Sequence, residues 1–323
     1  MKRTPAVVAI IAFYYEVFVI QALASSTVGI GFELTLNYGT TAVAFANGTT
    51  VPVARIEGGP AYKAEMRRVV AESLTPTRDP TFLTKMISST LKCLQFLNIV
   101  EKPLLESPWK GMLSALKMST EVFLEREIQT VDIVLPVTRP YSIKRYHQAQ
   151  DLDRVLQSVG LSRLNEQSTR SSIATCYANN LTSLSDIASP DFVLAVDYSR
   201  TALILSLENL EIGLLEVTKI TVHFDLGAGS ISKKRGYWKR VENEMLKLIR
   251  GVSIRHVVLS GDQIQVQPGL GDVIKKVVPK KVLQKMRLGM GGTSVDPVWA
   301  GAFGVARMAT QDDFEGVIDT AEL

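Results

Sequence analysis

Two stretches of this sequence repeat one pattern, and the repetition limits the folds that the chain can adopt. In each stretch an apolar strand meets a turn that contains glycine, threonine or serine, and further strands follow. The turns are the segments 36–41 and 197–201, and a later apolar strand follows each of them, at 132–137 and 257–262. We expect an α/β fold with two lobes, each a mixed sheet flanked by helices, whose hairpin turns meet at a cleft.

The first lobe begins with three predicted strands. They cover 28–36, 42–45 and 51–56, and Asn47-Gly48 is a hairpin signal between the second and the third. Amphipathic periodicity then predicts helices over 62–73, 82–97 and 111–125. A short buried strand at 131–137 and a helix over 141–160 follow, which is the order of a parallel β-α unit.

The second lobe repeats the hairpin and ends in helices. We expect strands at 192–197, 202–207, 211–217, 220–224 and 254–259, and one helix over 238–249 between the last two of them. We divide the chain into residues 1–24 (a leader or anchor), 26–190 (first lobe), 191–310 (second lobe) and 311–323 (tail).

Composition fits a folded chain with a large core. Of the 323 residues, 46% are hydrophobic and 21% charged, and the net charge of +4 is too small to indicate a nucleic-acid partner. The two cysteines and three histidines have no disulfide or metal-ligand spacing.

The N-terminus has the pattern of a secretory signal peptide. Lys2 and Arg3 precede an apolar run over 6–24, which ends in Ala-Leu-Ala before Ser25. Glu16 in the middle of the run argues against a stable membrane span, because a charge near the bilayer centre costs about 3 kcal/mol. We therefore expect a secreted or secretory-pathway protein, with sugar at the sequons of Asn47 and Asn180, and a cytoplasmic protein with a packed N-terminal helix is the alternative.

The order of these segments resembles one family. The run 132–137 with its helix and Val159-Gly160-Leu161, the segment 174–177, the hairpin from 192 to 207 and the end of the chain from 296 to 306 are similar to successive motifs of the 70-kilodalton heat-shock proteins. The resemblance covers most of 28–308, and it is greatest to the divergent heat-shock-70-like proteins of filamentous fungi. It implies an actin-like ATPase fold with ATP and Mg²⁺ as ligands.

The resemblance also implies which residues would bind the nucleotide. The segment Asp225-Leu-Gly-Ala-Gly-Ser has a sequence closer to the family's second phosphate loop than the segment 197–201 has. It follows the long hairpin, however, and this position favours 197–201 for that role. Gly227 and Gly229 are then backbone turns at the border of the cleft. The expected nucleotide-binding residues are Asn37, Gly39, Thr40, Thr41, Asp197, Ser199, Arg200, Thr201, Gly227, Gly229, Ser260 and Gly261, with Asp197 also near the metal.

Departures from the family pattern make hydrolysis doubtful. Asn37 takes the place of an acidic residue that organises the metal's water shell, and Thr169 takes that of the residue that holds the attacking water. One helix stands where the family inserts a subdomain over the adenine. We therefore assign no catalytic residue and expect a pseudo-ATPase or interaction protein with an unknown protein partner. A weak ATP-binding protein or slow ATPase with a chaperone-like role is the alternative, and a small-molecule kinase of the same superfamily is the third.

Overall fold

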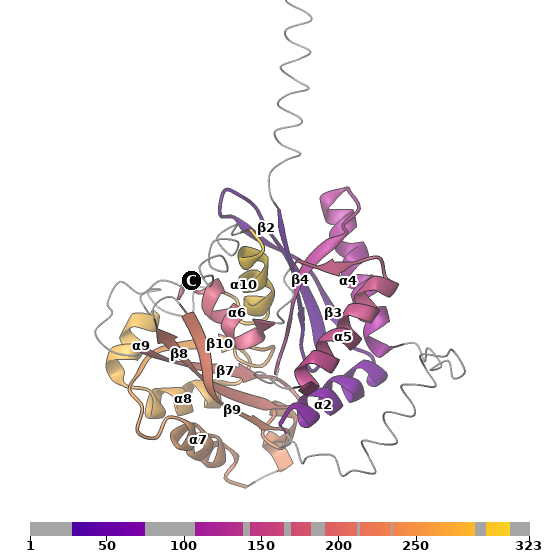
Figure 1. Ribbon diagram of the computed structural model, residues 1–323. Coiled ribbons are helices and arrows are strands. Elements are labelled where there is room, and N and C mark those ends of the chain that lie inside the picture. The colour runs from indigo at the N-terminus through magenta and orange to yellow at the C-terminus, as the bar shows by residue number, and fades with distance from the viewer. Residues whose placement is uncertain are drawn as a thin grey trace, which may run out of the picture.

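The computed structural model describes residues 28–74, 107–137, 143–164, 169–181, 191–211, 214–233, 235–287 and 295–310. The predicted leader, the predicted helix over 82–97 and the tail lie outside these residues. In the described part the chain is a mixed α/β protein with two mixed sheets (Figure 1). No helix there has the length and apolar character that crossing a membrane requires.

The first sheet has the strand order β3-β2-β1-β4-β5, and β6 also pairs with β4. β1, β2 and β3 are antiparallel neighbours in chain order, and β4 runs parallel to β1. The three strands and the Asn47-Gly48 hairpin were predicted, and Gly48 has the positive φ of 83° that this turn needs. The strands are β1 (Gly29–Leu34), β2 (Tyr38–Ala44), β3 (Thr50–Glu57), β4 (Thr130–Leu135), β5 (Ser162–Arg163) and β6 (Thr169–Arg170).

The second sheet repeats the arrangement of the first. Its order is β10-β7-β8-β9, with β7, β8 and β9 antiparallel in chain order and β10 parallel to β7. The segments 211–217 and 220–224, predicted as two strands, form one strand. The strands are β7 (Asp191–Tyr198), β8 (Leu203–Glu211), β9 (Leu214–His223) and β10 (Ile254–Ser260).

The helices and sheets form layers (Figure 1). One layer of helices covers the outer face of the first sheet, and another covers the outer face of the second. The helices α6 and α10 lie between the two sheets. The outer helices of the first lobe are α2 (Pro60–Leu74), α4 (Pro108–Leu124) and α5 (Ile143–Ser158); those of the second are α7 (Tyr237–Leu248), α8 (Pro268–Val277) and α9 (Lys280–Arg287); the central ones are α6 (Ser171–Ala178) and α10 (Ala300–Met308).

Small residues bring the central layer close to the first sheet. An added Cβ at Gly31 would lie 2.5 Å from the Ala302 carbonyl oxygen, and one at Gly304 would lie 1.6 Å from the Ala174 carbonyl oxygen. α10 therefore packs by its backbone on both β1 and α6. The same alternation of β1 that turns Gly29 and Gly31 toward α10 also turns Glu33 into the middle of the molecule.

The two lobes also share apolar contacts. Ala202 and Ile204 of the second lobe belong to the core formed by β1, β4, α2 and α4, and Val222 and Phe224 pack against it. The Arg67 guanidinium on α2 lies 4.6 Å from the centre of the Phe224 ring. These contacts join the lobes through a packed apolar interface.

Candidate functional site

The first hairpin turns earlier than predicted. Its turn covers residues 35–37, and the Thr35 hydroxyl organises it: this oxygen accepts from the backbone N–H of Asn37 at 3.2 Å and of Tyr38 at 3.0 Å, and donates to the Tyr38 carbonyl at 2.8 Å. The Thr35 N–H donates to the same carbonyl. The backbone donors of residues 35, 37 and 38 are thus bonded within the turn, and a threonine side chain occupies the concave side.

Gly39, Thr40 and Thr41 were predicted in this turn, and that prediction is wrong. All three are buried in β2. An added Cβ on Gly39 would lie 2.7 Å from the Met112 sulfur of α4, so the glycine permits close packing of that helix. Thr41 shares a hydrogen bond of 2.9 Å with Thr120 of α4. The Asn-x-Gly pattern was misleading because Thr35 supplies the turn chemistry and tertiary packing explains the glycine.

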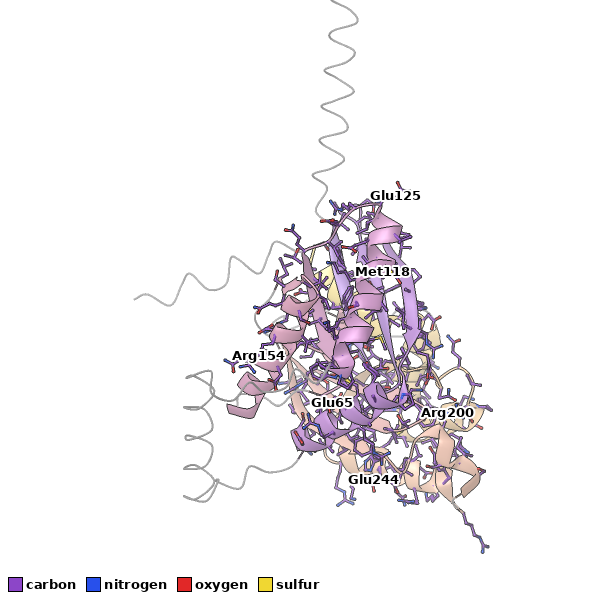
Figure 2. All side chains as sticks on the ribbon, turned by 90° about the vertical axis from the view of Figure 1, so that its right-hand side faces the viewer. Glu65, Met118, Glu125, Arg154, Arg200 and Glu244 are labelled. Atoms are coloured by element: carbon purple, nitrogen blue, oxygen red, sulfur yellow. The ribbon has the colours of Figure 1, made fainter. Side chains whose placement is uncertain are left out.

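The second hairpin turn lies where it was predicted. The Ser199 N–H donates to the Ala202 carbonyl at 3.0 Å, and the Ser199 hydroxyl accepts from the Ala202 N–H at 3.2 Å. Arg200 is exposed at the tip (Figure 2). As in the first turn, a side-chain oxygen completes the backbone hydrogen bonding.

The two turns touch each other. The Thr201 hydroxyl donates to Asn37 Oδ1 at 3.0 Å, and Asn37 is 3% exposed. Asn37 Nδ2 is buried without a hydrogen-bond partner. The hairpin turns are therefore joined by a direct hydrogen bond at the position predicted for a ligand between them.

Gly227 and Gly229 lie against the second turn. An added Cβ on Gly227 would lie 2.4 Å from the Ala202 nitrogen, and the N–H of Gly229 donates to the Arg200 carbonyl at 2.9 Å. The Ala228 N–H donates to the Ser199 carbonyl at 3.0 Å. Both glycines lie beside the turn, as predicted. The N–H groups of Ala228 and Gly229, however, already donate to backbone carbonyls.

Ser260 and Gly261 end β10 beside Asp197. Gly261 has a φ of 104°, and an added Cβ there would lie 2.7 Å from Asp197 Oδ1. Any side chain would be strained at this φ and would also contact the carboxylate. Asp197 and Ser260 line a small cavity at the junction of the lobes, with room for about one water molecule. Its other lining residues are Pro136, Ser171, Ser172, Ala195, Ile204 and Ser206.

Glu33 is a buried acid that the sequence predictions missed. Its carboxylate accepts hydrogen bonds from the hydroxyls of Ser171 and Thr40, the second at 3.3 Å, and from the backbone at Gly301 and Ala302. Burial raises the pKa of Glu33 to about 7, although these four hydrogen bonds act in the opposite direction. A charge inside the otherwise apolar segment Gly-Ile-Gly-Phe-Glu-Leu was the available signal.

Asp197 is a partly exposed acid at the same junction. Desolvation, with smaller contributions from the negative charges of Glu33 and Asp262, raises the pKa of Asp197 to about 7. Asp262 lies at the edge of this group, with its side chain 13% exposed and its Oδ2 at 3.3 Å from Arg55 Nη2. Arg55 comes from β3, so this ion pair also crosses between the lobes, and its guanidinium lies 4.4 Å from the centre of the Tyr38 ring.

Most of the backbone donors described in the two turns are already bonded within the protein. Of the basic side chains close to the acids at the junction, Arg55 pairs with Asp262 at 3.3 Å and Arg200 is exposed at the tip of the second turn. In that part, no three acidic, histidine or cysteine side chains are placed to hold a metal ion.

Neither the models of known protein families nor the curated proteins match this sequence.

Proposed function

We propose that this chain is a degenerate actin-like domain, of the heat-shock-70-like type, which acts as a pseudo-ATPase or interaction protein with weak or no nucleotide hydrolysis. The repeated strand order supports the actin-like assignment. Each sheet starts with three antiparallel strands and adds a fourth parallel to the first, and the two hairpins meet at their turns. Two facing copies of one unit are what the resemblance in sequence implies.

One observation carries the functional part of the proposal. The hydrogen bond from Thr201 to Asn37, at 3.0 Å, spans the gap that phosphates would have to occupy. Thr35 fills the first turn in the same way, because its hydroxyl accepts the N–H groups that an anion would need. Side chains of the protein thus take the contacts that a phosphate-binding loop offers to its ligand.

The alternative, a weak ATP-binding protein or slow ATPase with a chaperone-like role, is favoured by the acids at the lobe junction. Asp197 and Glu33 lie on the first strand of each hairpin, and Asp197 borders a cavity rich in hydroxyl groups. When bound, Mg²⁺ would supply charge neutralisation for phosphate oxygens there. Glu33 carries a carboxyl group on the first hairpin. The first lobe therefore still has an acidic side chain near the turns, although Asn37 is neutral.

Titration calorimetry with ATP, in the presence and in the absence of Mg²⁺, tests the proposal on the full chain. We expect no saturable heat of binding when ATP is titrated into micromolar protein, with or without Mg²⁺. We also expect the rate of ATP turnover to equal the buffer background. A tight, Mg²⁺-dependent signal from the unmodified protein would refute the pseudo-ATPase proposal and support the alternative.

A variant series identifies the cause of weak binding. Thr201→Val removes the hydrogen bond between the turns, and we expect it to strengthen ATP binding if this bond blocks the site. Asn37→Asp adds a charge without rebuilding an adenine pocket, so it should increase the Mg²⁺ dependence more than the affinity for ATP. Thr218→Val is the matched control for Thr201→Val, because it removes a hydroxyl hydrogen bond of 2.9 Å to the Leu207 carbonyl within the second sheet and lies outside the predicted nucleotide site.

A further inference from the structure

The outer face of α4 presents an uncharged stripe to solvent. It consists of Gly111, Ser114, Ala115, Met118 and Val122, which recur at helical spacing, and we call it the α4 stripe. Met118 is 64% and Val122 74% exposed. The opposite side of the helix, including Leu113 and Leu116, is fully buried in the core of the first lobe. Large apolar side chains on the solvent side of a helix that already buries its other face indicate an interaction surface.

Side-chain size changes along the stripe. Its N-terminal half has Gly111, Ser114 and Ala115, and its C-terminal half has Met118 and Val122. A second helix that runs in the opposite direction over the same face sets large side chains against small ones. Val122 of one helix then lies against Ser114 of the other, and the two Met118 side chains meet near the two-fold axis, as packing of one helix against its own copy allows.

Charged residues also differ between the two ends of the α4 stripe. Lys110 lies near the N-terminal end of α4 and Glu125 follows its C-terminal end, while Lys117 and Glu121 near the middle pair with each other at 3.6 Å on the same helix. Figure 2 shows Met118 and Glu125 on the side of α4 that faces the viewer. In an antiparallel pair Lys110 of one helix lies beside Glu125 of the other at both ends, while a parallel pair would bring like charges together.

We propose that the α4 stripe is the contact surface of a homodimer, in which two copies of α4 pack antiparallel about a two-fold axis near Met118. A helix of 17 residues is about 25 Å long, so the interface is at the small end of specific protein interfaces, below about 1,200 Å² in total. The dimer is therefore weak and its population depends on protein concentration. This inference goes beyond the proposed function, because it needs no nucleotide and no assignment of the fold family.

Sedimentation velocity of the full chain over a range of concentrations tests the dimer. We expect Met118→Glu to weaken association about tenfold or more, because the two-fold axis sets the two new charges side by side. Leu246→Glu is the matched control, since Leu246 is an apolar residue 44% exposed on α7. It should change the dissociation constant less than about twofold.

Charge reversal then tests the antiparallel geometry. Lys110→Glu and Glu125→Lys should each weaken self-association, because each places like charges at both ends of the helix pair. A mixture of the two variants should form a heterodimer about tenfold tighter than either homodimer, because both end contacts become attractive again.

Either of two results would overturn the proposal: an unmodified chain that is monomeric at every concentration, or a dimer that withstands Met118→Glu. A dimer that formed through the apolar run 6–24 would withstand Met118→Glu, because it would not involve α4. A dimer that is sensitive to Met118→Glu but shows no gain in the mixture would refute the antiparallel arrangement. Circular dichroism of each variant verifies that these exposed substitutions leave the fold intact.

Discussion

Asp197→Asn should stabilise the protein at pH 8 and have little effect near pH 4. Burial and the nearby negative charges raise the pKa of Asp197 from 3.8 to about 7. A raised carboxyl pKa means that the folded state holds its proton more tightly than the unfolded state does. The contribution of this group to stability is therefore complete below pH 3.8, falls as the pH rises toward 7, and is lost above that value.

The magnitude follows from the size of the shift. About three pH units at 1.36 kcal/mol each give roughly 4 kcal/mol at pH 8, and about 2 kcal/mol at pH 5.5, where only half of the interval has been crossed. Asparagine has nearly the same shape as the protonated acid and does not ionise. The gain in the free energy of unfolding from Asp197→Asn should therefore be about 2 kcal/mol larger at pH 8 than at pH 5.5.

Urea unfolding in EDTA at pH 5.5 and pH 8 measures this difference. Asp272→Asn is the control, because Asp272 pairs at 3.1 Å with Lys275 on a well exposed part of α8, where the loss should stay below about 1 kcal/mol. An equal effect of Asp197→Asn at the two pH values, or a loss of stability at pH 8, would refute the reasoning. A loss at pH 8 that appears only with Mg²⁺ present would instead indicate that a cation keeps Asp197 ionised.

Three further predictions concern the lobes and the N-terminus. Gly304→Ala should lower the free energy of unfolding by about 3 kcal/mol, measured with urea, because the new methyl would lie 1.6 Å from the Ala174 carbonyl; an unchanged midpoint would contradict the close contact of α6 with α10. Phe224→Ala should cost about 2 kcal/mol and speed proteolysis between the lobes, since this ring packs against the first lobe's core; unaltered cleavage would argue against an apolar junction. Peptide mapping of native protein should find an N-terminus near Ser25 and sugar on Asn47, which is exposed in its turn; an intact leader without sugar would remove the secretory assignment.

The strands of both lobes could be predicted because their signals are local. Alternation, β-branched residues and the Asn47-Gly48 turn give the three-strand meander of the first sheet without knowledge of the rest of the chain. Predictions of this kind depend on a few neighbouring residues, and they were mostly right.

The site could be predicted only in part, because long-range packing determines it. Asp197, Ser260 and Gly261 meet as predicted. Gly39 was predicted in a turn but packs against Met112 of α4, and Glu33 was not singled out although its carboxylate is buried against α10. The α4 stripe was hidden for the same reason, since the pattern of a helix does not reveal which of its apolar residues a sheet will cover.

If nucleotide binding is as weak as we propose, the contacts that close the two lobes on each other would be a cause independent of missing ligand contacts. A ligand that enters between the turns must break the bond between Thr201 and Asn37, separate Arg55 from Asp262, and expose part of the apolar interface around Ile204. At about 1 kcal/mol for each polar contact and roughly 2 kcal/mol for the apolar surface, opening costs several kcal/mol. Each 1.4 kcal/mol lowers the apparent affinity tenfold, because only the open state binds. The same contacts fix the relative position of the two lobes, which is consistent with the proposed role as an interaction protein.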